Sequence, residues 1–274
     1  MAINRRKFMK TLFLSIVGLV GFIYLDSFWI EKYIIDWNEF DVSNNSSNKI
    51  KIIQLSDLHL HEIKYFHKTI AEKINSENPD IIAFTGDTIT RTSKFPVLKK
   101  LLDLIDPEIL KIVILGNKEH DGRILVSELN DVFKDYNGLV LVNENYIFDK
   151  LDRKINIIGV DSLMHGNPDF KKAITGIDKK LDTVVLNHCP EYSDVIDDLN
   201  QDEEVNIKMI LSGHTHGGQI TFFGKEIYKP VGSGRYLKGW YQNKNTKMYV
   251  SKGIGTTALP IRFCARAEAI IFHI

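Results

Sequence analysis

The sequence predicts a layered α/β protein behind an apolar N-terminal segment. From residue 49 onward, short runs rich in Ile and Val alternate with stretches whose apolar residues recur at helical spacing. The last part of the chain contains strand-like runs (QITFFG, KMYVSKG and AIIFHI) without helical patterns between them. Alternating strands and helices followed by strands indicate packed layers of sheet and helix.

The composition fits an ordinary globular protein and excludes several classes. Hydrophobic residues make up 44% of the 274 residues and charged residues 26%, which argues against disorder. Lys and Arg balance Asp and Glu at 35 each, so no global basic field is present to hold nucleic acid. Two cysteines, Cys189 and Cys264, form neither a disulfide framework nor a CxxC metal motif.

The N-terminus has the pattern of an export signal or a membrane anchor. Residues 4–10 (NRRKFMK) place four cations before the apolar run 11–25. That run spans roughly 22 Å as a helix, short of a ~30 Å hydrocarbon core, and residues 26–30 (DSFWI) complete the length. The alternative to a signal or an anchor is a helix buried in the core of the folded protein, which the basic flank on one side only disfavours.

We favour a retained anchor over a cleaved signal because no small-x-small cleavage site follows the apolar run. The basic side then stays in the cytoplasm, giving a single-pass protein of the cell membrane with its folded domain outside. Arg5 and Arg6, with Phe8, also resemble a twin-arginine signal, which would export the domain.

The chain divides into residues 1–30 as signal or anchor, 31–49 as connector and 50–274 as the folded domain. The connector is inferred from its polar, turn-prone end, VSNNSSNK at 42–49. Short apolar runs predict strands at 49–56, 80–87, 111–117, 138–143, 146–148, 155–161, 182–188 and 208–214. Amphipathic spacing predicts helices at 64–77, 95–105, 123–134, 169–180 and 191–199.

Polar residues with metal-ligand chemistry follow five of the predicted strands. They are Asp57, His59, Asp87, Asn117, His188, His214 and His216. Singly, each has a structural explanation: a helix N-cap for Asp, a turn for Asn, a hydrogen-bonded core position for His. Those explanations do not account for DxH, GD, GN, H and GHxH in order, each closing a strand. Because ligands collect at the carboxyl ends of strands in α/β sheets, we expect these side chains to converge.

The donor set predicts two divalent metals. Imidazole suits Mn, Fe, Zn, Ni or Co, while carboxylate and amide oxygens suit Mn. One carboxylate must bridge, and Asp87 is the natural choice because it follows a central strand. Two metals about 3.5–4 Å apart clamp the attacking and leaving oxygens of an in-line displacement, and the water they share becomes a bridging hydroxide nucleophile.

The ordered motifs are similar to those of the calcineurin-like metallophosphoesterase superfamily, and most of all to its membrane-associated YkuE/YaeI-like branch. The shared features are QLSDLH, GHTHGGQ, a late G-x-G-x-x-x-x-P-x-R and a basic-plus-apolar N-terminus. The resemblance covers roughly residues 50–274. It implies a four-layer α/β/β/α sandwich of two mixed β-sheets flanked by helices, and a metal-dependent phosphohydrolase.

The resemblance also implies roles by position. Asp57, His59 and His216 would ligate one metal; Asn117, His188 and His214 would ligate the other, and Asp87 would bridge. Some relatives cleave a pyrophosphate bond in a lipid-linked sugar nucleotide, which implies a lipid-phosphate substrate class as one option beside small phosphorylated molecules.

One motif departs from the family pattern. The usual G-N-H-[DE] is GNKEH here, so Lys118 replaces the histidine that contacts the phosphate or protonates the leaving group. We expect Lys118 to stabilise developing charge and His120 to act as general acid, unless His120 is a solvated loop residue. Without an acid, monoesters with poor leaving groups would suffer most, which favours phosphodiester or pyrophosphate bonds.

Arg262, in the late Pro-x-Arg, either binds a substrate phosphate or packs against the sheet with a salt bridge. The leading interpretation is a monomeric, binuclear phosphoesterase of the membrane surface. The alternatives are a non-catalytic metal-binding scaffold of the same fold, and a nuclease or cyclic-nucleotide phosphodiesterase. The neutral charge balance and outward topology disfavour the nuclease, because nucleic-acid binding requires a basic groove.

Overall fold

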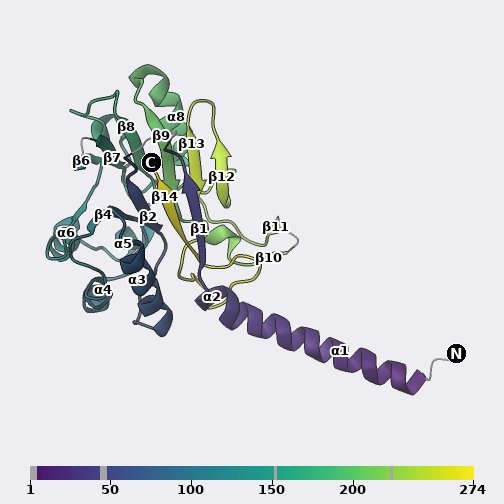
Figure 1. The fold of residues 1–274 in the computed structure, drawn as a ribbon. Helices are drawn as coiled ribbons and strands as arrows, with labels where there is room; N and C mark the ends of the chain where they lie inside the picture. Colours follow the sequence, from purple (N-terminus) through teal and green to yellow (C-terminus); the bar gives the residue numbers. More distant parts are fainter. Residues whose placement is uncertain (1–4, 44–47, 151–152, 223–224) are drawn as a thin grey trace.

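The computed structural model describes residues 5–43, 48–150, 153–222 and 225–274. Two six-stranded mixed sheets pack face to face, and helices cover the outer face of each, so the α/β/β/α sandwich is confirmed (Figure 1). Residues 1–4, 44–47, 151–152 and 223–224 lie outside the described residues. Among the predicted segments, the connector 31–49 includes 44–47, and the strand-like run QITFFG includes 223–224.

The first sheet has the order β1-β14-β2-β3-β4-β5. Its strands are β1 (Asp36–Asp41), β14 (Glu268–His273), β2 (Lys51–Leu55), β3 (Ile81–Thr85), β4 (Leu110–Ile114) and β5 (Gly138–Val140). Strands β2 to β5 run parallel, and β14 is antiparallel to β2. The outer face of this sheet packs on α3 (Tyr65–Glu77), α4 (Phe95–Leu102) and α6 (Val126–Lys134).

The second sheet has the order β12-β13-β9-β8-β7-β6. Its strands are β12 (Gly239–Gln242), β13 (Lys247–Val250), β9 (Ile207–Ser212), β8 (Asp182–Leu186), β7 (Arg153–Gly159) and β6 (Glu144–Lys150). Helices α7 (Phe170–Ala173) and α8 (Tyr192–Glu203) cover its outer face. A small hairpin, β10 (Thr221–Phe222) and β11 (Lys225–Glu226), stands apart from both sheets.

The central strands are buried on both faces, which explains their continuous apolar runs. In β2, Ile52 packs between the two sheets while its neighbour Ile53 packs against the helices. In β3, Ile81 and Ile82 divide in the same way. A strand with two dry faces needs no polar alternation, so its sequence reads as Ile, Val and Leu without interruption.

Two predicted segments differ from the structure. The expected connector 31–49 contributes strand β1, which lies parallel to β14 with Trp37 and Phe40 packing on opposite faces of the sheet. Its other residues are polar because it is an edge strand, so it lacked the apolar run used to find strands. The helix expected at 169–180 is only α7, because Gly176 adopts a positive φ of 81° shortly after it.

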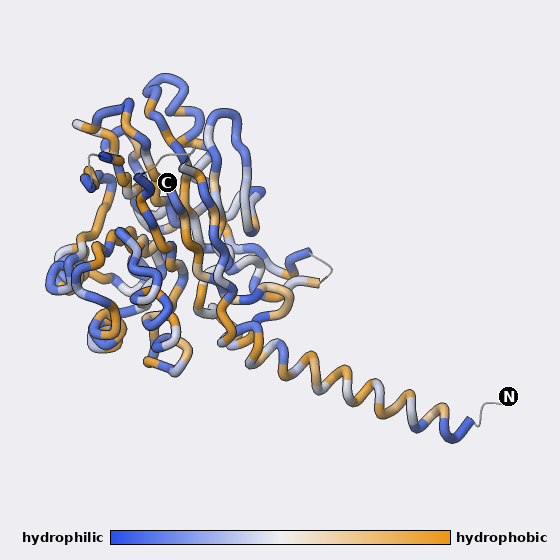
Figure 2. The backbone as a smooth tube through the Cα atoms, in the orientation of Figure 1, coloured by the Kyte–Doolittle hydropathy of each residue, from blue (hydrophilic) through white to orange (hydrophobic). Residues whose placement is uncertain are grey.

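The N-terminal helix leaves the domain as a separate rod. Helix α1 (Arg5–Leu25) has no buried residue, and it continues through η1 (Asp26–Ile30) into α2 (Glu31–Tyr33). The continuous helix Arg5–Tyr33 is long and apolar enough to cross a membrane, as a signal sequence would also be. Figure 2 shows this helix, coloured mostly as hydrophobic residues, running away from the body of the protein.

Candidate metal centre

The seven side chains expected to bind metal lie together where strands of both sheets end. Asp57 and His59 follow β2, Asp87 follows β3, and Asn117 begins the short helix α5 (Asn117–Asp121) after β4. The second sheet contributes three histidines: His188 follows β8, and His214 and His216 follow β9. Each of the seven is at most 8% exposed, so the cluster is a buried polar site.

One group of donors is formed by Asp57, His59 and His216. The Nε2 atoms of His59 and His216 lie 3.1 Å apart, and their rings stack with centroids 5.0 Å apart. Asp57 Oδ1 lies 3.5 Å from His216 Nε2. Two imidazole nitrogens that face each other at this distance can share one proton or one cation, and the adjacent carboxylate favours a cation.

A second group of donors surrounds His188. Its Nε2 lies 3.3 Å from Asn117 Oδ1, and its ring centroid is 5.0 Å from that of His214. Asp87 lies between the groups: its Oδ1 is 3.5 Å from His188 Nε2 and its Oδ2 is 3.6 Å from His59 Nε2. One carboxylate oxygen therefore points to each group, which is the geometry of a bridging ligand.

The protonation states of these groups fit metal binding. Burial, together with neighbouring positive groups, lowers the pKa of His59 to about 3 and that of His214 to about 4. Burial also lowers the pKa of His216, so these imidazoles are neutral at pH 7 and free to act as ligands. Burial and the charge of Asp57 raise the pKa of Asp87, a conflict between two close carboxylates that divalent cations would relieve.

Hydrogen bonds outside the donor set orient the ligands. His188 Nδ1 donates to the Thr85 carbonyl at 2.8 Å, which leaves Nε2 for Asn117 and Asp87. His214 Nε2 donates to the Val231 carbonyl at 2.8 Å, which leaves its Nδ1 free. Such partners set the tautomer and the ring orientation of a metal-binding histidine. Asp57 accepts from the hydroxyl of Ser56 at 2.6 Å.

Glu119 supports the site from behind, a role that sequence reasoning missed. Its Oε1 accepts the N–H groups of Thr88 and Ile89 at 2.7 and 3.1 Å. Its Oε2 accepts those of Asp87 and Gly116 at 3.0 and 2.9 Å. Burial and the charge of Asp87 raise the pKa of Glu119 to about 7. The carboxylate thus ties the loop after β3 to the loop after β4, and the acidic position of the GNKEH motif was its sequence signal.

Two glycines allow the loops to approach the ligands closely. A Cβ at Gly116 would lie 2.2 Å from Asp87 Oδ1, and one at Gly213 would lie 1.9 Å from Ser56 Oγ. Both distances are below any real contact, so a side chain at either position would displace a predicted ligand or its support.

A cavity of about 610 Å³ opens beside the metal donors. Asp87, Asn117, His214 and His216 are among its polar lining residues. Its apolar lining residues are Met164, Ile220, Ile227, Tyr228, Pro230, Val231, Ala258 and Leu259. A mostly apolar cleft with a few convergent polar groups is typical of a site for an organic ligand.

The structure separates the two residues expected to act in catalysis. Lys118 lines the cavity, its Nζ lies 2.8 Å from Asp121 Oδ2, and its backbone N–H donates to Asp87 Oδ1 at 2.7 Å. His120 is not among the lining residues; its Nε2 lies 2.7 Å from Asp161 Oδ1, a hydrogen bond that raises the pKa of His120. Apart from the predicted metal ligands His214 and His216, the described imidazole that lines the cavity is that of His165, which bonds to Asp121.

Arg262, which we expected either to bind a substrate phosphate or to pack against the sheet with a salt bridge, is not among the residues that line the cavity. Its side chain is fully buried, and its guanidinium donates to backbone carbonyls, at 2.6 Å to Gly255, 2.8 Å to Ala265 and 2.9 Å to Lys252. Burial lowers the pKa of Arg262 to about 10, so the group stays charged at neutral pH. The partners of the guanidinium are backbone carbonyls rather than an acidic side chain, so Arg262 holds the loops around His216 in place.

Cys189 lies beside the donors: its Sγ is in one group with nitrogens of His188 and His214. Burial raises the pKa of the Cys189 thiol to about 12, and the sulfur is 3.7 Å from Ser162 Oγ. The thiol therefore packs against Ser162 at the edge of the site.

Comparison with known proteins gives consistent results. The family model of calcineurin-like phosphoesterases matches residues 50–218. The chain is 32% identical to the uncharacterized metallophosphoesterase YkuE of Bacillus subtilis (strain 168), covering 98% of this chain and 96% of that protein. It is 26% identical to the UDP-2,3-diacylglucosamine pyrophosphatase LpxG of Chlamydia trachomatis, covering 82% and 83%. The crystal structure of TT1561 from Thermus thermophilus, 12% identical, matches with a TM-score of 0.50 over 76% of this chain and 91% of that one.

Proposed function

The chain belongs to the calcineurin-like phosphoesterase family, and from this premise we propose that it hydrolyses a phosphodiester or pyrophosphate bond of a lipid-linked phosphate at a membrane surface. Membership of this family makes it a metal-dependent phosphohydrolase. The binuclear centre, the substrate class and the location are our proposals.

The observation that carries the proposal is the position of Asp87 between two groups of donors. With one oxygen 3.5 Å from His188 and the other 3.6 Å from His59, it can serve two cations at once. Asp57, His59 and His216 would hold one cation. Asn117, His188 and His214 would hold the other. The mixture of imidazole, carboxylate and amide donors suits Mn, Fe, Zn, Ni or Co.

Two divalent cations, when bound, activate a water molecule and neutralise charge on the phosphate. The chain's own residues then position the substrate. Lys118 lines the cavity next to Asn117 and would donate to a phosphate oxygen, with Asp121 holding its ammonium group in place. Of the two histidines near this position, His165 reaches the cavity and His120 faces Asp161.

This arrangement favours substrates whose leaving group needs little protonation. With His120 paired to Asp161, no imidazole of the GNKEH motif reaches the cavity to protonate a poor leaving group. When a pyrophosphate bond breaks, the leaving group is a phosphate that departs as a stable anion, and His165 can supply a proton where an alkoxide leaves. Pyrophosphate bonds, and diesters with an acidic leaving group, therefore fit the site better than alkyl esters.

A lipid attached to the phosphate fits three further features. Much of the cavity lining is apolar. The N-terminal helix is long enough to cross a membrane, and its basic start favours a cytoplasmic N-terminus with the domain outside. The similar protein LpxG is named for a substrate that joins a nucleotide to a diacylated sugar through pyrophosphate.

The test is the full-length variant Asp87→Asn, assayed with added Mn on a bis-aryl phosphodiester, a lipid pyrophosphate, RNA and a cyclic nucleotide. We expect loss of at least 100-fold in turnover together with reduced metal content, because removal of a bridging carboxylate weakens both sites. Asp131→Asn makes the same chemical change at an exposed position of α6 and should leave both unchanged. Full Mn-dependent turnover in Asp87→Asn would refute the assignment; absence of bound metal in the unaltered protein would support a scaffold instead.

A further inference from the structure

Among the residues that the structure describes, five large apolar side chains stand exposed at the cavity or on the hairpin beside it. They are Phe222, Ile227, Tyr228, Val231 and Leu259, between 54% and 73% exposed, and we call them the apolar rim. Four of them also line the cavity, while Phe222 does not. A cluster of exposed apolar side chains next to a site marks a surface that meets a protein or a membrane.

The end of the N-terminal helix is bonded to the segment that carries this rim. The backbone N–H of Arg262 donates to Ser27 O at 3.0 Å, and the N–H of Ala265 donates to Glu31 Oε2 at 2.7 Å. Ser27 and Glu31 are both buried against this segment. Leu259, which lines the cavity, stands only three positions before Arg262, so part of the cavity wall begins where the helix ends.

The same segment holds the other half of the rim. Phe263 O accepts the N–H of Thr221 at 2.9 Å, and the ring of Phe263 stacks on Phe222 with centroids 6.5 Å apart. The buried guanidinium of Arg262 donates to five backbone carbonyls around it, which stiffens the segment. The hairpin of the rim and the helix are therefore connected through a single short, braced piece of chain.

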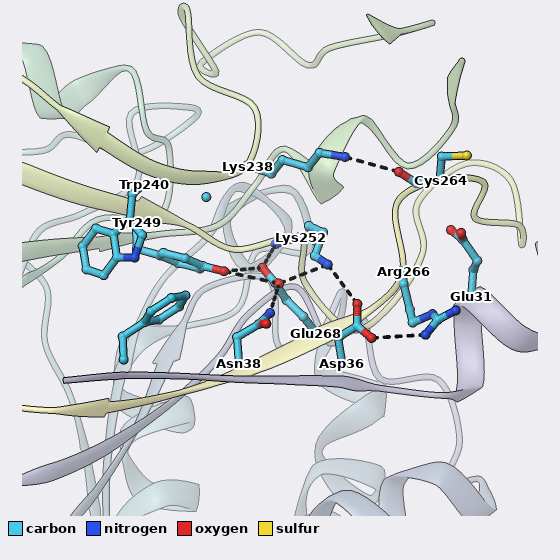
Figure 3. A pocket seen from close by; sticks show the side chains of 12 residues that line it. Glu31, Asp36, Asn38, Lys238, Trp240, Tyr249, Lys252, Cys264, Arg266 and Glu268 are labelled. Atoms are coloured by element: carbon cyan, nitrogen blue, oxygen red, sulfur yellow. Dashed lines mark hydrogen bonds and ion pairs between the residues drawn. The ribbon is translucent and has the colours of Figure 1, made fainter. Parts of the chain in front are cut away.

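Charged contacts fix the start of β1 just after the helix (Figure 3). Asp36 lies 3.2 Å from Lys252 Nζ and 3.3 Å from the guanidinium of Arg266, and Lys252 lies 3.2 Å from Glu268. Because hydrogen bonds and ion pairs hold the chain before and after α2, the long N-terminal helix is fixed in one direction relative to the domain. In that direction the β10–β11 hairpin projects on the side from which α1 leaves (Figures 1 and 2).

We propose that the apolar rim docks into the surface of the lipid bilayer that α1 crosses, so that the mouth of the cavity opens directly to the lipid. The occupant is the membrane itself because the helix entering it is bonded to the same segment. This proposal rests on the proposed function, since it explains how a lipid-linked phosphate reaches the metal centre without leaving the bilayer.

Depth in the membrane can be measured with an environment-sensitive nitrobenzoxadiazole label on single cysteines. The full-length chain with Cys264→Ser is suitable, because Cys189 is fully buried and Cys264 is exposed. The labelled sites are Phe222→Cys on the rim, Val195→Cys on α8 as an exposed control, and Gly18→Cys in α1. The protein is reconstituted in phosphatidylglycerol–phosphatidylethanolamine vesicles with and without doxyl-labelled lipid.

We expect the Gly18 and Phe222 labels to shift to the blue and to be quenched by doxyl lipid, and the Val195 label to do neither. If the Gly18 label is quenched but the Phe222 label remains in water, the docking proposal is overturned while the membrane anchor stands. A Gly18 label in water would overturn it as well, because the helix would then not cross the bilayer.

Activity gives a second test that separates docking from catalysis. In vesicles, Phe222→Ser should lower turnover of a lipid pyrophosphate about tenfold, the effect of losing one buried aromatic side chain, and leave turnover of a soluble bis-aryl phosphodiester unchanged. Val195→Ser should change neither. Equal loss on both substrates, or no loss on the lipid, would contradict docking. Failure of the unaltered protein on every phosphate substrate would instead refute the proposed function, and the label positions would still judge the docking.

Discussion

Replacing Glu119 with glutamine is expected to weaken the fold and the metal centre together. The carboxylate is 1% exposed and accepts four backbone N–H groups, two on each oxygen. Glutamine has nearly the same shape, but one of its two terminal atoms is an amide nitrogen that cannot accept. Whichever way the amide turns, two N–H groups lose their acceptor.

The magnitude follows from those two groups. A buried donor left unsatisfied costs about 1–3 kcal/mol, so two cost about 2–6 kcal/mol before relaxation. If the amide nitrogen replaces Oε2, it faces the N–H groups of Asp87 and Gly116, which would push the loop carrying Asp87 away from the loop carrying Asn117. We expect the free energy of unfolding to fall by about 2–4 kcal/mol and Mn affinity to fall at least tenfold.

Urea unfolding followed by far-ultraviolet circular dichroism, with a parallel Mn titration, measures both quantities on the full-length protein in detergent. Glu72→Gln is the matched control, since Glu72 is exposed on α3 and the change removes the same charge. If Glu119→Gln unfolds at the urea concentration of the unaltered protein and binds Mn equally well, the four hydrogen bonds do not support the site and the reasoning fails.

Three more predictions follow from single contacts. Gly213→Ala should reduce Mn affinity tenfold or more by isothermal titration with the fold intact, because its Cβ would lie 1.9 Å from Ser56 Oγ and 2.5 Å from Asp57 Oδ2; unchanged affinity would contradict this. Burial lowers the pKa of His67 to about 4, so as the pH falls from 6.5 toward 4 this histidine gains a proton only in the unfolded chain, which destabilises the fold. In His67→Gln, the free energy of unfolding lost between pH 7 and pH 5 should therefore be smaller by about 2 kcal/mol. A pH profile identical to that of the unaltered protein would contradict this prediction. Arg262→Met should lower the urea concentration at the midpoint of unfolding, because the backbone carbonyls around the buried guanidinium would lose their donor. A raised KM with unchanged stability would instead indicate that Arg262 contacts the substrate.

The sequence predicted the strands well where a strand is buried on both of its faces. Such strands carry unbroken apolar runs, so β2, β3, β4, β8 and β9 were found within a few residues of their bounds. Convergence of the seven polar residues was predictable for a related reason: each follows an apolar run, and the carboxyl ends of parallel strands meet at one edge.

Features that depend on distant partners could not be found this way. Strand β1 forms because β14, more than 200 residues away, offers an edge, and its own residues show no apolar run. The burial of Arg262 depends on carbonyls of His216, of Lys252 and Gly255, and of Ala265, which lie on three separate loops, while its sequence shows only a cation near a proline. His165 lies in a loop without a motif, so nothing in the sequence marked it as a residue of the cavity lining.

Backbone conformation explains why aspartate and histidine stand at these strand ends. Five of the seven predicted ligands have a positive φ, between 43° and 72°: Asp57, His59, Asp87, His214 and His216. The left-handed region costs an ordinary residue about 1–2 kcal/mol, and Asn, Asp and His are enriched there among residues other than glycine. Sharp turns of this kind let each strand end present its side chain sideways to a shared centre. Glycine would turn the chain as readily but offers no donor atom, so the positions require residues that tolerate the conformation and also bind metal.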